Sequence, residues 1–333
     1  MPRDFYQIFM MTQILTLNKW NPERDYISQA AKIINSGGLV AFPTETVYGL
    51  GGDALNPESV KKIYAAKGRP SDNPLILHVS NIEQAESLVY MNDTARKLAK
   101  IFWPAPLTLV LPAKNIIPSI TRGGLNTAAV RMPDNNIALA LIERAKTPIA
   151  APSANLSGRP SPTDSESVYN DMNNRIDLIL DGGRTGIGLE STVIDISDPG
   201  KILLLRPGGL SRELIESELN TSLGVPDLNS AKRSPGTRYR HYAPSLPVKI
   251  LRNESDLDLI DIKSAGFMGI HNNNYNYAAK IIFDSPENFA HGLFSGFREL
   301  ESQNISCIIV EWPRDNSGIN EALRDRIKRA AGE

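Results

Sequence analysis

The sequence predicts an α/β protein with two domains. The larger, N-terminal domain has a twisted mixed sheet with flanking helices, and the smaller one has an open α/β sheet. Short apolar runs alternate irregularly with helical segments, which favours a mixed sheet over a strict βαβ repeat. Residues 224–247 interrupt this pattern with four prolines and no helical period. We therefore predict domains at 21–223 and 248–333, joined by a linker at 224–247.

Composition excludes several classes of protein. The 333 residues are 41% hydrophobic and 22% charged, and 36 Lys plus Arg balance 37 Asp plus Glu. No global field therefore draws the chain to nucleic acid or to a membrane. The single cysteine, Cys307, lies in an apolar run and is expected to be a buried small side chain. No signal-peptide pattern and no apolar run of about 18 residues occurs, so we expect a cytoplasmic protein without membrane contact.

Helix start signals and apolar runs set the elements of the first domain. Asn21-Pro22-Glu23 predicts a helix that Gly37-Gly38 end, and Asn56-Pro57-Glu58 repeats the signal. Ser80 with Glu83 forms a capping box that predicts a further helix. Strands are predicted at Leu39–Phe42, Leu75–Val79, Leu107–Leu111, Ala128–Arg131, Ile149–Ala151, Leu178–Leu180, Thr192–Ile196 and Ile202–Leu205, and helices near Ile137–Arg144 and Ser211–Leu219.

The C-terminal part shows the pattern of a small, Rossmann-like open sheet. Its predicted helices, Ser285–Glu301 and Asn316–Arg329, are amphipathic. Its predicted strands are Val248–Leu251, Gly266–Ile270, Ile281–Phe283 and Cys307–Glu311.

The common nucleotide and hydrolase signatures are absent from the sequence. It contains no GxxxxGK[ST], no GxGxxG at the start of a helix, no HExxH, no CxxC and no GxSxG. Its four histidines are too scattered to predict a His-ligated metal site. The chemistry must therefore come from other motifs.

The segment AAKGRPSDNPL at Ala65–Leu75 indicates an anion site. Arg69 offers a planar fork for phosphate oxygens, Lys67 is a mobile point charge, and Gly68 allows the backbone to approach a ligand. A solvated turn would explain this loop taken alone. Its neighbours Thr46, Asn73 and His78 favour the site.

Three further segments place polar groups after buried runs. APSANLSGRPSPT at Ala151–Thr163 offers hydroxyls and backbone N–H groups that suit a polyphosphate or a carboxylate, although an ordinary polar loop would look similar. Arg131 ends an apolar strand and needs an anionic partner, because an unpaired buried charge is costly. GLEST at Gly188–Thr192 and LRPGG at Leu205–Gly209 add hydroxyls and a second arginine.

Together with GGLVAFPTETVYGLGG at Gly37–Gly52, these motifs resemble the YrdC-type threonylcarbamoyl-AMP synthase family. SPGTRYRHYAP at Ser234–Pro244 is similar to the linker of the long, two-domain form, with Thr237 where Met is more usual. The resemblance spans about Gly37–Pro244 and extends weakly beyond it. It implies synthesis of threonylcarbamoyl-AMP from L-threonine, bicarbonate or CO2, and ATP, with loss of pyrophosphate, for threonylcarbamoyladenosine in tRNA. Mg²⁺ is expected with ATP, held mainly by phosphate oxygens and water.

The resemblance also implies roles for single residues. Lys67 and Arg69 are the predicted catalytic cations near the phosphates, and Arg131 would hold the threonine carboxylate. The implied threonine pocket consists of Thr46, His78, Arg131, Ala151 and Ser191. The implied ATP site consists of Arg69, Asn73, Thr127, Ser153, Ser161, Arg206 and Tyr242. No protein metal ligands are predicted, and a tRNA threonylcarbamoyl transferase is the expected downstream partner.

Two hypotheses about the basic residues stay open. The block Arg238–Tyr242 contains aromatic and cationic side chains that a simple spacer does not need, so the linker is predicted to close over the nucleotide as a lid. Packing between the two domains would also explain the block. Alternatively, Lys67, Arg69, Arg131 and the linker could form a basic groove for double-stranded RNA or tRNA without catalysis, and weak RNA contact is also compatible with an enzyme.

Overall fold

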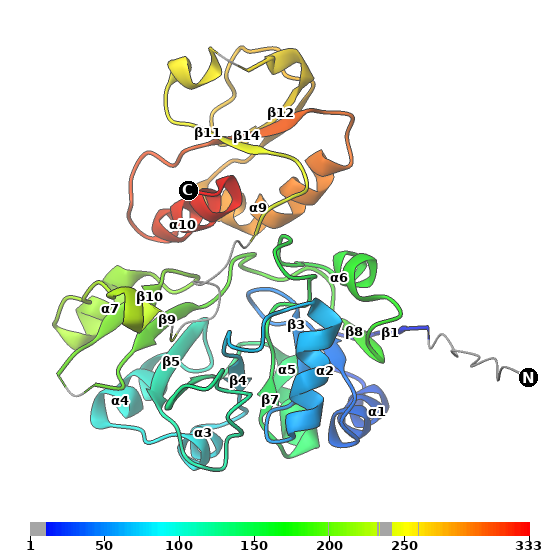
Figure 1. Cartoon of the computed structure of the whole chain (residues 1–333), viewed down its shortest axis with the longest axis vertical. Helices are drawn as coiled ribbons and strands as arrows, with labels where there is room; N and C mark the ends of the chain where they lie inside the picture. The colour runs from blue at the N-terminus through cyan, green and yellow to red at the C-terminus, as the bar shows by residue number, and fades with distance from the viewer. Residues whose placement is uncertain (1–10, 199, 232, 234–241, 259) are drawn as a thin grey trace, which may run out of the picture.

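Two sheets organise the chain, with a larger body below and a smaller one above it in Figure 1. The computed structural model describes residues 11–198, 200–231, 233, 242–258 and 260–333. The larger sheet has the strand order β1-β8-β2-β3-β7-β4-β6-β5-β9-β10, and the smaller one has the order β11-β14-β12-β13. The predicted fold class, α/β with one large and one small sheet, is confirmed.

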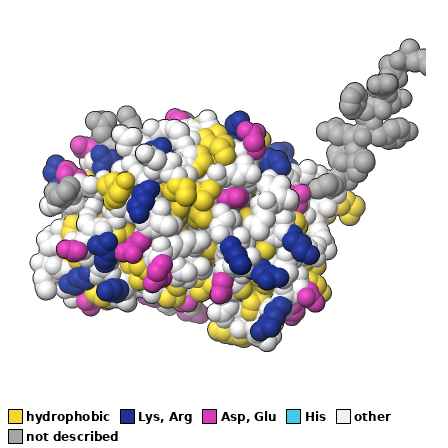
Figure 2. Space-filling model, turned by 90° about the horizontal axis from the view of Figure 1, so that it is seen from below, with side chains coloured by type: hydrophobic (Ala, Val, Ile, Leu, Met, Phe, Trp, Pro, Cys, Tyr) yellow, Lys and Arg dark blue, Asp and Glu magenta, His cyan; other side chains and the backbone are white. Residues whose placement is uncertain are grey.

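The outer surface carries charges of both signs. On the face that Figure 2 shows, Lys and Arg side chains lie interspersed with Asp and Glu side chains, in keeping with the formal net charge of −1. Among the helices that the structure describes, none has the length and apolar character needed to cross a bilayer.

The larger sheet is mixed, as predicted. Parallel pairs such as β4/β6 and β5/β9 stand beside antiparallel pairs such as β5/β6 and β4/β7. Its strands are β1 (Gln13–Thr16), β2 (Val40–Phe42), β3 (Gly49–Asp53), β4 (Ile76–His78), β5 (Leu107–Pro112), β6 (Thr127–Arg131), β7 (Ile149–Ala150), β8 (Leu178–Asp181), β9 (Thr192–Asp195) and β10 (Leu203–Arg206).

Most helices of this domain begin at a polar side chain that accepts hydrogen bonds from the first turn, which satisfies N–H groups that the helix itself leaves free. Asn56, Asn92 and Asn135 are examples of such caps. The helices are α1 (Arg24–Asn35), α2 (Pro57–Lys67), α3 (Ile82–Leu88), α4 (Asp93–Phe102), α5 (Asn136–Ala145), α6 (Ser165–Met172) and α7 (Arg212–Leu219).

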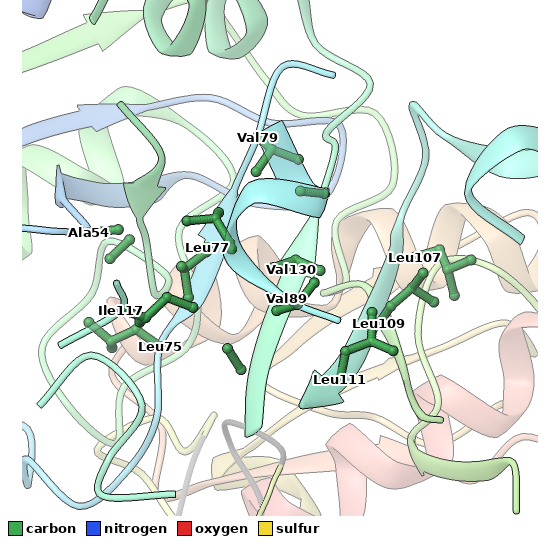
Figure 3. Close-up of a cluster of buried hydrophobic side chains, with 14 of the residues drawn as sticks. Ala54, Leu75, Leu77, Val79, Val89, Leu107, Leu109, Leu111, Ile117 and Val130 are labelled. Carbon is green, nitrogen blue, oxygen red and sulfur yellow. The ribbon is translucent and has the colours of Figure 1, made fainter. Parts of the chain in front are cut away.

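Strand alternation sends neighbouring residues of the larger sheet into different cores. On one face, β4, β5 and β6 contribute Leu77, Leu109 and Val130 to the main core (Figure 3). On the other face, α1 and α5 pack on β2 and β8, and a smaller cluster containing Ile76 and Val110 lies toward β9 and β10. The gap between these two clusters on the second face is where the polar side chains of β4 and β6 lie.

The smaller sheet is wholly parallel, as the pattern of an open α/β sheet predicts. Its two long helices lie on the side of the sheet that faces the larger domain (Figure 1). The elements of this domain are β11 (Val248–Leu251), η1 (Glu254–Leu257), η2 (Ile262–Ser264), β12 (Ala265–Gly269), β13 (Ala279–Ile282), α9 (Pro286–Glu301), β14 (Cys307–Glu311) and α10 (Ile319–Ala331). Cys307 is buried, as expected.

Three local predictions are wrong in detail. The cap of α3 is Asn81 rather than Ser80, because the Asn81 side chain accepts from the Gln84 N–H and Ser80 N instead donates to the Gln84 side chain. α1 starts at Arg24, and no side chain caps it: Glu23 is the N-cap residue, but its carboxylate accepts from Asn18 N. In its described part the linker contains a short helix, α8 (Leu228–Ala231), where no helix was predicted.

Candidate active site

Three polar side chains form a row across one face of the larger sheet. His78 of β4 is the register partner of Arg131 of β6, which is also opposite Thr108 of β5. Side chains of register partners lie on the same face, so the row follows from the strand pairing. All three residues are buried, and the row fills the gap between the two apolar clusters of that face.

The turn between β2 and β3 covers this row. The Arg131 Nη1–H donates to Thr46 Oγ1 at 3.0 Å, and the Thr46 and Thr44 hydroxyl oxygens are 2.7 Å apart. Thr44 in turn donates to the Val47 carbonyl at 2.7 Å, so Thr46 is the donor to Thr44. This chain of hydrogen bonds fixes the Thr46 side chain beside the guanidinium.

Arg131 already holds a carboxylate in this structure. Its Nη2 forms an ion pair with Glu45, whose side chain is 11% exposed against 4% for Arg131. The prediction that this arginine needs an anionic partner is therefore confirmed. Arginine binds carboxylates through a planar fork, so the same group can accept the carboxylate of a ligand in exchange for Glu45.

His78 is a neutral side chain. Burial, reinforced by the positive charge of Arg131, lowers its pKa to about 3. The imidazole therefore adds no positive charge to the pocket near pH 7, and Arg131 provides the cation of the row.

His78 makes the stability of the fold depend on pH. Between pH 6.5 and 3 the unfolded chain binds a proton that the folded chain does not, so this contribution is complete above pH 6.5 and is lost as pH falls. From pH 7 to pH 5 we expect it to lower the free energy of unfolding by about 2 kcal/mol. Urea unfolding at both pH values in the wild type and in His78→Gln measures the difference. An equal drop in both proteins would contradict the assignment.

Two arginines lie beside this row. The Arg69 Nε is buried and has no hydrogen-bond partner among the described residues, while Nη2 donates to the Pro74 carbonyl at 3.2 Å. Burial lowers the pKa of Arg69 to about 10, so the group is still charged at pH 7. Arg206 donates to the Ser191 carbonyl at 2.9 Å, and burial lowers its pKa as well. Two desolvated cations in one pocket favour an anionic ligand.

Lys67 lies under the pocket rather than in its lining. Its ammonium donates to the Ser153 carbonyl at 2.5 Å and to the Asn155 carbonyl at 2.6 Å, and the residue is 2% exposed. Burial, with the nearby charge of Arg69, lowers its pKa well below the ordinary value. Lys67 therefore fixes the loop after β7 in this structure.

The loops GLEST and LRPGG meet at a close contact. A Cβ at Gly208 would lie 2.3 Å from the backbone of Ser191, so only glycine allows the two loops to touch. This contact brings Arg206 to Ser191, whose hydroxyl oxygen is also 2.8 Å from Thr108 Oγ1. Ser191 thus connects the second arginine with the row on the sheet.

Tyr242 closes one side of the pocket. It is 4% exposed, and its φ of 66° lies in the left-handed region, which costs about 1–3 kcal/mol for a residue with a side chain. The ring stacks on Phe294 of α9, and burial raises the pKa of the hydroxyl. The other members of the predicted lid block, Arg238–His241, lie outside the described residues.

One pocket gathers nine of the residues that were predicted from the sequence: Thr46, Arg69, His78, Arg131, Ala151, Ser153, Ser191, Arg206 and Tyr242. Four lie outside its lining. Lys67 is beneath it, Ser161 donates to Glu190, Asn73 is buried with no described partner for its amide group, and Thr127 starts the strand that Arg131 ends. Their predicted contacts with ATP stay predictions.

Sequence reasoning missed two polar residues of the lining, Thr44 and Glu190. Thr44 belongs to the Pro-Thr-Glu-Thr corner, where only Thr46 was singled out. Glu190 is the carboxylate of GLEST, a segment from which only the hydroxyl groups were predicted to belong to the site. The signal for Glu190 was a carboxylate directly before two hydroxyl-bearing residues, Ser191 and Thr192.

Comparison with known proteins agrees with this architecture. A model of the Sua5–YciO–YrdC family, described as "Telomere recombination", matches residues 32–208, and one described as "Threonylcarbamoyl-AMP synthase, C-terminal domain" matches 210–332. The fold and the pocket thus define a two-domain protein of the Sua5 type.

Two relatives that match most of the chain carry the name of one enzyme. Threonylcarbamoyl-AMP synthases of Pyrococcus abyssi and Bacillus subtilis are each 44% identical, over 91% and 92% of this chain and 93% of each relative. The chain belongs to the threonylcarbamoyl-AMP synthase family, in its long, two-domain form. The crystal structure of P. abyssi Sua5 complexed with L-threonine superposes with a TM-score of 0.89 at 41% identity, covering 96% of this chain and 98% of that one. Escherichia coli YciO, at 26% identity, covers 60% of this chain with a TM-score of 0.55.

Proposed function

We propose that this protein is an enzyme that makes threonylcarbamoyl-AMP from L-threonine, bicarbonate or CO2, and ATP, and releases pyrophosphate. The observation that carries the proposal is one pocket in which a carboxylate-binding arginine, Arg131, lies near a partly buried arginine, Arg69, and a buried one, Arg206. An amino acid needs the first group, and a triphosphate needs the others. The P. abyssi relative is described in complex with L-threonine, which supports the amino-acid half.

The reaction requires the protein to position the substrates and to stabilise negative charge, and it requires no nucleophile from the protein. The threonine amine and CO2 form a carbamate with loss of a proton, and a carbamate oxygen then attacks the α-phosphorus of ATP. The bond from the α-phosphorus to the bridging oxygen breaks, and pyrophosphate leaves with the added negative charge. Arg69 and Arg206 are proposed to stabilise that charge, while Arg131 holds the threonine carboxylate in place of Glu45.

Mg²⁺ is proposed to enter with ATP as part of the substrate complex. In the described part of the chain, no three His, Cys, Asp or Glu side chains form a group that could hold a metal ion. The one carboxylate of the lining, Glu190, is hydrogen-bonded to Ser161 and paired with Arg326. Phosphate oxygens and water would therefore provide most ligands of the ion.

The pocket must open for ATP to enter. Its cavity volume is about 60 Å³, whereas sites for whole ligands are typically about 300–1,000 Å³. Tyr242 belongs to the linker and lies in the wall of the pocket, so its displacement would enlarge the pocket, which is how a lid is expected to act. Closure after binding would protect the hydrolysable carbamoyl adenylate from water.

The alternative of an RNA groove is not favoured by the positions of the cations. Lys67 and Arg131 are 2% and 3% exposed and turn inward, where an RNA backbone cannot reach them. We propose that any tRNA contact is weak and that the product passes to a tRNA threonylcarbamoyl transferase.

The proposal is tested by pyrophosphate release from ATP, with L-threonine or bicarbonate omitted in turn. Release should require both co-substrates, because the amino-acid and phosphate sites must be filled together. Turnover of ATP at the same rate without threonine would overturn the proposal.

Side-chain choice gives a second expectation. L-Serine lacks the methyl group that a pocket walled by Thr46 and His78 would enclose, so its kcat/KM should be lower by a factor that corresponds to about 1–3 kcal/mol. Steady-state pyrophosphate release with each amino acid measures the ratio. Equal kcat/KM values would mean that this wall does not select the substrate.

A further inference from the structure

Arg326 of α10 is a charged residue of the C-terminal domain that reaches the pocket of the other domain. Its side chain is 0% exposed. Nε donates to Glu190 Oε2 at 2.7 Å, and Nη2 donates to the Pro207 carbonyl at 3.1 Å. Both acceptors belong to the larger domain, and Glu190 lines the pocket. The guanidinium also pairs with its neighbour Asp325.

Glu190 is the only carboxylate in the lining of this pocket, as far as the described residues show. Its second oxygen accepts from Ser161 Oγ at 2.5 Å. Burial by itself would raise its pKa, but Arg326, Arg206 and Ser161 together lower it, so the group is ionised near pH 7. A negative charge therefore lies in the pocket that is proposed to take a polyphosphate, and Arg326 is the cation that pairs with it.

Arg326 also touches the residue that closes the pocket. Its guanidinium lies 5.1 Å from the centre of the Tyr242 ring, within the range of a cation–π contact. Phe294 of α9 stacks on the same ring at 5.4 Å. The two long helices of the C-terminal domain thus hold Tyr242 between an aromatic and a cationic side chain.

The position of these helices against the pocket is defined by close packing. A Cβ at Gly188 would lie 2.5 Å from the backbone of His291 in α9, so the GLEST segment and α9 touch at a glycine. The His291 ring nitrogen Nε2 lies 2.8 Å from the Thr185 carbonyl. These contacts fix the backbone of the GLEST segment against α9, so the positions of Glu190 and Arg326 relative to each other are set by packing between the two domains.

We propose that Arg326 is a positioning residue of the synthase: from the C-terminal domain it neutralises Glu190 and holds Tyr242, so that the pocket can bind the phosphates of ATP. This inference rests on the proposed function. Without Arg326 the Glu190 carboxylate would face the incoming phosphates as a like charge in a desolvated site, where such repulsion is poorly screened. The proposal gives the C-terminal domain a part in nucleotide binding.

The test compares three full-length variants with the wild type. Arg326→Met keeps much of the apolar volume and removes the charge, and we expect KM for ATP to rise about 10- to 100-fold with a smaller change in kcat. Adding Glu190→Gln to Arg326→Met removes the uncompensated charge and should bring the KM for ATP most of the way back to the wild-type value. Arg212→Gln is the matched control, because it breaks another interdomain ion pair, with Glu321 on the same helix α10, away from the pocket.

The outcomes separate the possibilities. Rescue by Glu190→Gln supports charge neutralisation, since a purely structural role of Arg326 would leave the double variant as impaired as the single one. A wild-type KM in Arg326→Met, or no rescue, overturns the proposal. If Arg326→Met does not fold, Arg326→Gln also removes the charge but keeps a polar side chain; its KM should rise as well, and a KM equal to that of the wild type would count against the proposal. Failure of the wild type to release pyrophosphate would refute the proposed function itself.

Discussion

Replacing Arg131 by methionine is expected to lower kcat/KM for L-threonine at least about 100-fold, equivalent to about 3 kcal/mol. The Arg131 side chain is 4% exposed and has Glu45 and Thr46 as side-chain partners. Because the site is buried, bulk water cannot replace the hydrogen bonds that the guanidinium would make. Loss of the fork removes the group proposed to hold the substrate carboxylate. Arg131→Lys keeps the charge beside Glu45 but loses the bidentate geometry, and we expect most of the defect to remain.

A folding control is needed because Arg131→Met leaves the Glu45 carboxylate buried and unpaired, which is costly in itself. The double variant Arg131→Met/Glu45→Gln removes that charge and should melt cooperatively while it still uses threonine poorly. Arg122→Met is the matched control, because it removes a partly buried arginine whose hydrogen bonds, among the described residues, are to backbone carbonyls. If Arg131→Met is folded and uses threonine with wild-type kcat/KM, the carboxylate site lies elsewhere.

Replacing Arg69 by alanine is expected to weaken ATP binding by about 2 kcal/mol or more, which is roughly 30-fold. Its buried Nε has no partner among the described residues, and among those residues its only hydrogen bond is to the Pro74 carbonyl, so most of its donors are available for a phosphate. Arg69→Lys should recover little, because an ammonium cannot reproduce the fork.

Titration calorimetry with a non-hydrolysable ATP analogue measures the change in equilibrium affinity separately from turnover. Arg175→Ala is a control matched in charge, since it removes an exposed arginine that, within the described part of the chain, donates to the Ala66 carbonyl near the end of α2. Wild-type affinity in both Arg69 variants would show that the loop is a solvated turn.

Sequence patterns predicted the larger features of the fold because they rest on local signals. The strand at β4 and the helix at α2 follow directly from an apolar run and from an Asn-Pro start signal. Two strands were missed. β3 reads GLGGD, and glycine has little strand preference, so its pairing with β2 and β7 is decided by tertiary contacts. β1 lies at the edge of the sheet and is mostly exposed.

Two helices of the larger domain, α4 and α6, were also missed. α4 begins at the capping side chain of Asn92, and α6 at that of Asp164. Such caps are common in loops as well, so a single Asn or Asp without a proline or a Glu three residues later is a weak signal.

In the candidate site, too, residues without a strong local sequence signal were missed. Arg131 and Arg69 stood out because a charge beside an apolar run requires a partner. Glu190 and Arg326 did not, because their significance comes from each other, across 136 residues and two domains. On the sequence alone, Arg326 is one of several cations of an amphipathic helix, and no local pattern tells it from Arg324 or Lys328.

Identifying the product itself tests the proposed reaction most directly. The protein is incubated with ATP, L-threonine and carbon-13 bicarbonate, quenched rapidly and analysed by mass spectrometry. The proposed reaction predicts threonylcarbamoyl-AMP that carries the label in its carbamoyl carbon, formed in equal amount to pyrophosphate. It also predicts that no such product forms when threonine is left out. Pyrophosphate release without a labelled adduct, or an adduct of threonine and AMP that lacks the label, would contradict it.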